Sequence, residues 1–66
     1  MTQYEVRVRK NKDKGKPWME ITPLGYSGSI RGVQGYCRNI LAFQEVVAVR
    51  YNRRGGGMKP QIMRKK

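Results

Sequence analysis

Apolar and charged residues alternate along residues 3–10, where Tyr4, Val6 and Val8 are separated by single charged residues. A period of two is typical of a β-strand with one buried face and one solvated face. We therefore predict a first strand over residues 3–10.

A loop and a second strand are predicted to follow. Residues 11–17 contain Asn, Asp, Gly and Pro, which favour a turn. In residues 18–22, Met19 and Ile21 share one side of an extended chain, and a proline ends the run. The two strands would form an antiparallel hairpin, and residues 24–28 would connect it to the next element.

A helical period starts at Ile30 and is predicted to extend to Gln44, with Ser27 or Ser29 as the N-cap. Gly32 and Gly35 oppose a helix, at about 1 kcal/mol each relative to alanine. Close approach of the helix to a sheet is one reason for glycine at such positions. The apolar stripe that supports the helix consists of Val33, Tyr36, Cys37, Ile40 and Leu41.

Residues 45–52 are rich in β-branched and aromatic side chains, which predicts a third strand. A flexible turn at residues 53–57 follows, and residues 58–64 allow a fourth strand. Pro60 has no N–H to donate, so a strand here belongs at the edge of a sheet. We expect the tail at residues 65–66 to be frayed.

The predicted fold class is α+β, in a single domain over residues 1–66. It has a small antiparallel sheet of three to four strands, in the order β-β-α-β with room for a last β, and one helix packed on one face. The predicted core consists of Tyr4, Val6, Val8, Met19, Ile21, Val33, Cys37, Ile40, Leu41, Val47, Val49 and Tyr51.

The charge is strongly unbalanced, with 15 Lys and Arg against 4 Asp and Glu, a formal net charge of +11. Residues 1–16 carry six basic and two acidic side chains, residues 17–49 two of each, and residues 50–66 seven basic and no acidic ones. Such an excess attracts polyanions and exceeds the net charge of about 2–8 that keeps a small domain in solution. The chain therefore resembles a binding module for an acidic polymer.

Strand alternation turns part of this charge into one surface. If the valines face the helix, then Arg7, Arg9 and Arg50 face away from it, with Trp18 beside them. Arginines on such a face can reach guanine edges in a major groove, or Trp18 can stack on a splayed base; alternatively, Trp18 caps the core. The predicted nucleic-acid-binding residues are Arg7, Arg9, Lys10, Lys12, Lys14, Lys16, Trp18, Arg50, Arg53, Arg54 and Lys59.

Catalytic chemistry has little support in the sequence. There is no histidine, the four acids are dispersed, and the one cysteine, Cys37, falls on the apolar helix stripe. We expect no cofactor, no metal site and no enzyme activity. The residual enzyme hypothesis is a histidine-free ribonuclease that uses Arg, Lys and the tyrosines Tyr26, Tyr36 and Tyr51.

The leading functional prediction is a non-catalytic nucleic-acid-binding module whose partner is DNA or RNA. The alternative is a small, phage-type regulator or inhibitor that binds an acidic surface of a larger protein such as a polymerase or nuclease. A third hypothesis is a ribosome-associated protein whose basic ends become ordered on RNA. We expect a cytoplasmic, soluble protein without a membrane partner, because no apolar run is long enough for a span; the sequence leaves the oligomeric state open.

Overall fold

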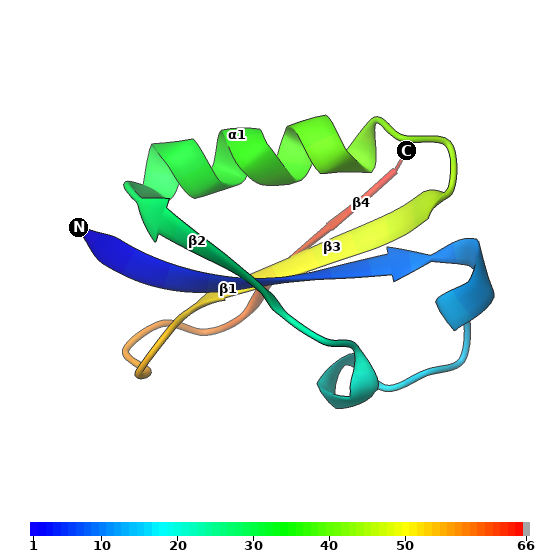
Figure 1. Cartoon of the computed structure of the whole chain (residues 1–66), viewed down its shortest axis with the longest axis horizontal. Coiled ribbons are helices and arrows are strands. Elements are labelled where there is room, and N and C mark those ends of the chain that lie inside the picture. The colour runs from blue at the N-terminus through cyan, green and yellow to red at the C-terminus, as the bar shows by residue number, and fades with distance from the viewer. Residues whose placement is uncertain (66) are drawn as a thin grey trace.

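One helix lies across one face of a four-stranded sheet (Figure 1) in the computed structural model, which describes residues 1–65. This confirms the predicted α+β class and adds the fourth strand, giving the order ββαββ. The elements are β1 (Thr2–Lys10), β2 (Leu24–Gly28), α1 (Ile30–Leu41), β3 (Val46–Arg53) and β4 (Gln61–Arg64), with two short 3₁₀ turns, η1 (Asn11–Asp13) and η2 (Trp18–Glu20). None of the described helices is long and apolar enough to cross a membrane.

The sheet has the strand order β2-β1-β3-β4, and every neighbouring pair is antiparallel. The two long strands, β1 and β3, are central, and Val6 lies opposite Tyr51. The short strands β2 and β4 form the edges. The basic N-terminal and C-terminal segments of the chain are therefore brought side by side in one sheet.

The core lies between α1 and the sheet. Alternation along β1 places Tyr4 and Val6 under the helix, where they are 5% and 0% exposed. The buried cluster comprises Tyr4, Val6, Val33, Cys37, Val46, Val49 and Tyr51, and Val8, Ile40 and Leu41 pack against it half-buried. Most of the predicted core is thus confirmed, and Val46 joins it.

The prediction of a strand at residues 18–22 is wrong. Residues 18–20 form η2, with Pro17 at its N-cap and the N–H of Glu20 donating to the Pro17 carbonyl at 3.0 Å. Prolines at positions 17 and 23 remove N–H donors at both ends of this segment, so it pairs poorly with a strand. As a result Met19 is 75% exposed and outside the core, although Ile21 is buried.

The partner of β1 is instead residues 24–28, which the sequence indicated as a connection. Tyr26 lies opposite Tyr4 in this pairing. Its ring also stacks on Tyr36 of α1, with 5.1 Å between ring centroids. A glycine-rich segment becomes a strand here because its one aromatic side chain, Tyr26, is held between the sheet and the helix.

The helix begins at Ile30 as predicted, and of the two candidate N-caps, Ser27 and Ser29, it is Ser29 that caps it: the Ser29 Oγ accepts a hydrogen bond from the Gly32 N–H at 3.1 Å. It ends at Leu41 rather than Gln44, because the chain turns immediately to enter β3. That turn is closed by a hydrogen bond from the Val46 N–H to the Phe43 carbonyl at 3.1 Å.

A β-bulge changes the faces at the start of β3. Arg9 pairs with Ala48 and Lys10 pairs with Val46, so Val47 is an extra residue without a partner on β1. A bulge reverses the in-out alternation locally. Val46 is consequently 2% exposed, whereas Val47, predicted in the core, is half-buried.

The last strand, β4, begins directly after Pro60 and pairs with β3. It lies at the edge of the sheet, as predicted from the missing N–H of Pro60. Beyond it, the Lys65 amino group donates hydrogen bonds to the carbonyls of Phe43 and Gln44. The sequence also predicted that Lys66 is frayed, but Lys66 lies outside the described residues.

Candidate nucleic-acid interface

The sheet face opposite α1 carries a row of cationic side chains. In the register of the sheet, Arg7 of β1 lies beside Arg50 of β3, which lies beside Ile62 of β4. Residues directly opposite each other on antiparallel strands share a face. Arg7 and Arg50 are therefore neighbours on the face away from the helix, as the alternation predicts.

A second row adds an arginine that the sequence analysis missed. Arg9 lies opposite Ala48, and Ala48 lies opposite Arg64 on β4. Arg64 is exposed on this same face. Alternation alone could not place it, because the long connection from β3 to β4 leaves their register undefined in the sequence.

Arg7 is covered although it lies on the open face. Its exposed fraction is 9%, and its Nε donates to the Ile21 carbonyl at 3.2 Å. Its Nη1 lies 3.7 Å from Glu5 Oε1. The connection between β1 and β2 thus lies against Arg7, whose guanidinium holds that connection and is screened from an incoming ligand.

Arg9 and Trp18 are occupied with each other. The Arg9 guanidinium lies 4.1 Å from the centroid of the Trp18 ring, and its Nη2 donates to the Lys16 carbonyl at 2.6 Å. Such a cation–π contact stabilises by about 0.5–2 kcal/mol. Trp18 is half-buried, so one of its ring faces is closed to a base by Arg9.

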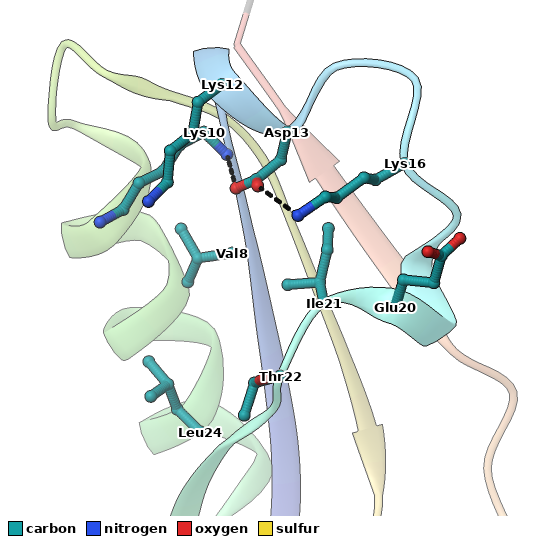
Figure 2. Close-up of a pocket in the computed structure, with 9 residues that line it drawn as sticks. All are labelled: Val8, Lys10, Lys12, Asp13, Lys16, Glu20, Ile21, Thr22 and Leu24. Atoms are coloured by element: carbon teal, nitrogen blue, oxygen red, sulfur yellow. Dashed lines mark hydrogen bonds and ion pairs between the residues drawn. The ribbon is translucent and has the colours of Figure 1, made fainter.

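The lysine-rich loop at residues 10–16 is organised by Asp13, which is 9% exposed. One Asp13 oxygen accepts from the Lys10 N–H at 3.3 Å, and the other lies 3.6 Å from Lys16 Nζ. In Figure 2 the amino groups of Lys10 and Lys12 point away from Asp13, toward the side of β1 on which Val8 and α1 lie, whereas Lys16 and Glu20 lie on the other side. These side chains line an open pocket of about 360 Å³.

A second cationic loop joins β3 to β4. It carries Arg53, Arg54 and Lys59, all exposed. Its glycines at positions 55, 56 and 57 have φ of 90°, 92° and 88°, a region that side chains rarely adopt. In Figure 1 this loop and the 11–23 connection lie near opposite ends of the sheet, both on the side away from α1.

The positive charge on this side has few partners. Two ion pairs occur among residues 1–65, Glu5 with Arg7 and Asp13 with Lys16. The four lysines between residues 10 and 16 are exposed. Four more exposed cations lie on β3, on β4 and in the connection between them: Arg53, Arg54, Lys59 and Arg64. A surface of this kind concentrates polyanions around it.

The residues considered for catalysis lie elsewhere. Cys37 is fully buried on the inner side of α1, and burial raises the pKa of its thiol to about 11, so it stays protonated near neutral pH. Tyr51 accepts a hydrogen bond from Gln34 on the helix side, where Tyr26 and Tyr36 stack. Within residues 1–65, no group of three or more His, Cys, Asp or Glu is placed to hold a metal ion.

The fold and the site together define a small ββαββ protein with one cationic sheet face bordered by two cationic loops. No model of a known protein family matches the chain, and searches of curated proteins and of solved structures also give no match.

Proposed function

We propose that the protein is a non-catalytic nucleic-acid-binding module that uses the face of the sheet opposite α1. The observation that carries the proposal is the distribution of charge: Arg50 and Arg64 lie on this face, and exposed cations occupy both loops beside it. Of the acids nearby, Glu5 and Asp13 are paired, and Glu20 is exposed in the 11–23 connection. Phosphates bind such surfaces with release of condensed counterions.

The structure changes the set of residues on which the proposal depends. Arg7 and Arg9 hold the 11–23 connection in place, so their contribution to binding is indirect. Direct contacts are assigned to the loop lysines and to the arginines of β3, β4 and their connection. The proposed contact residues are Lys14, Lys16, Arg50, Arg53, Arg54, Lys59 and Arg64. Lys10 and Lys12 are left out because their amino groups point to the α1 side of the sheet.

The test is a gel-shift panel with double- and single-stranded DNA and RNA at two salt concentrations. With about six phosphate contacts, log K on duplex DNA should fall with log salt at a slope of about −5. Binding to none of the four nucleic acids at low salt contradicts the proposal. Polyglutamate serves as the competitor: if it displaces nucleic acid at equal charge concentration, an acidic protein surface becomes the better partner.

Matched double variants locate the surface. Arg54→Ala with Lys59→Ala removes two exposed charges from a cationic loop, and Arg31→Ala with Arg38→Ala removes two from α1. The loop variant should reduce the salt slope by about 2 because each lost phosphate contact lowers it by about 1. The helix variant has the same net charge and should keep the wild-type slope; equal losses in both would place the binding surface elsewhere.

A further inference from the structure

The aromatic side chains of residues 1–65 offer little stacking surface on the cationic side. Tyr4 and Tyr51 are 5% and 3% exposed and belong to the core. Trp18 is half-buried and covered on one face by Arg9. Phe43 is 60% exposed, but it follows α1 at the turn into β3. Proteins that hold single strands stack successive bases on several exposed aromatic rings, and the described part of this face has one partly covered ring.

Two side-chain amides on this side are engaged. Asn52 donates to Glu5 Oε1 at 3.4 Å and to the Arg53 carbonyl at 3.3 Å. Gln3 donates to Ser27 Oγ at 3.0 Å. Asn and Gln are the side chains that read adenine in a groove. Apart from the exposed Asn11, this surface presents to a ligand lysines and arginines, which contact phosphates and, in the case of arginine, also guanine.

The two cationic loops are separated by the length of the sheet. The nine residues of β1 extend over about 30 Å at roughly 3.3 Å each. The longest dimension of the molecule is 32 Å, and β1 runs along it in Figure 1. One turn of duplex DNA is about 34–36 Å long. Two groups of phosphates one turn apart on a rigid duplex therefore match the loops at either end of the sheet.

The loops also limit how closely the sheet can approach a ligand. Both lie on the side away from α1 (Figure 1), so they border the arginines of the open face. A duplex that lies along the strands meets the loops first, at its backbone.

From these observations we infer that the ligand is a nucleic-acid duplex, held through its phosphates without reading of the bases, with the duplex axis along β1 and β3. The inference rests on the proposed function and adds the strandedness of the ligand and the mode of contact. A single strand gains less, because it is flexible and the face offers its bases one partly covered ring to stack on.

The experiment measures the affinity of the full chain for three unrelated 24-base-pair duplexes and for their separated strands, at 100 mM and 200 mM salt. The duplexes should bind at least about tenfold tighter than the single strands and agree with one another within about threefold, as expected for phosphate contacts alone. Emission of Trp18, the one tryptophan of the chain, is recorded in every titration and should not be quenched by stacking.

Duplex length provides an independent readout. Duplexes of 6, 8, 10, 12 and 16 base pairs should show a rise in salt slope that levels off once the duplex exceeds one turn. In the variant Arg54→Ala with Lys59→Ala, one loop is weakened, and the slope should level off at a shorter length.

The outcomes separate the two proposals. Single strands that bind as tightly as duplexes, or strong quenching of Trp18, overturn the inference and leave nucleic-acid binding standing. A tenfold difference among the three duplexes overturns the phosphate-only mode. No binding to any probe overturns the proposed function itself.

Discussion

Tyr26 and Gly32 meet where α1 crosses the edge of the sheet. A Cβ added at Gly32 would overlap the Tyr26 hydroxyl, whereas a Cβ at Gly35 would meet no atom within 4 Å. The sequence suggested that a helical glycine allows close approach to the sheet. That explanation is confirmed for Gly32; nothing in the structure explains Gly35.

Gly32→Ala should destabilise the fold by about 1–3 kcal/mol, because the new methyl group forces the Tyr26 ring out of its place. Gly35→Ala should stabilise it by about 0.5–1 kcal/mol through helix propensity alone. Urea denaturation of both variants measures the two changes. Tyr26→Phe combined with Gly32→Ala should recover part of the loss; full loss in the double variant would mean that the hydroxyl is not the obstacle.

The elements that follow a clear hydrophobic period were predictable. β1 and β3 alternate, and the stripe through Val33 and Cys37 sets the buried side of α1, so local sequence determines these elements. Segment 18–22 has strand-forming side chains too. It does not form a strand, because Pro17 and Pro23 flank it and a side chain of β1 binds its backbone. The pairing of residues 24–28 depends on Tyr26 reaching both Tyr4 and Tyr36, which no local pattern reveals.

The 11–23 connection depends on the stacking of Arg9 on Trp18. Trp18→Leu should remove this contact, destabilise the protein by about 1 kcal/mol and increase amide exchange in residues 16–21. Hydrogen exchange followed by NMR or mass spectrometry measures the effect. Ile62→Ala, a change at an exposed apolar side chain on β4, is the control and should leave exchange in this connection unchanged.

At the level of the whole molecule, only part of the candidate site could be predicted from the sequence. Net charge and alternation correctly placed Arg7 and Arg50 on one face. Neither reveals that the 11–23 connection covers Arg7, nor that the β3–β4 register brings Arg64 onto that face. Both facts depend on how long connections fold back over the sheet.

A formal charge of +11 on 66 residues also opposes folding, because like charges repel most in the compact state. Raising NaCl from 20 mM to 300 mM should therefore raise the Tm of the free protein, as screening shortens the range of repulsion from about 20 Å to about 6 Å. Calorimetry measures this shift. Lys12→Gln with Lys14→Gln and Lys59→Gln should reduce it; an equal shift in this variant would point to a general salt effect.

The strand β4 also affects whether two copies of the protein associate. It leaves an outer edge of only four residues, between Pro60 and the cations Arg64 and Lys65. Exposed edges invite pairing with another chain, and short, charged edges discourage it. If the protein binds a polyanion as proposed, the ligand neutralises that charge, and neighbouring sheets crowded along one ligand can then join edge to edge.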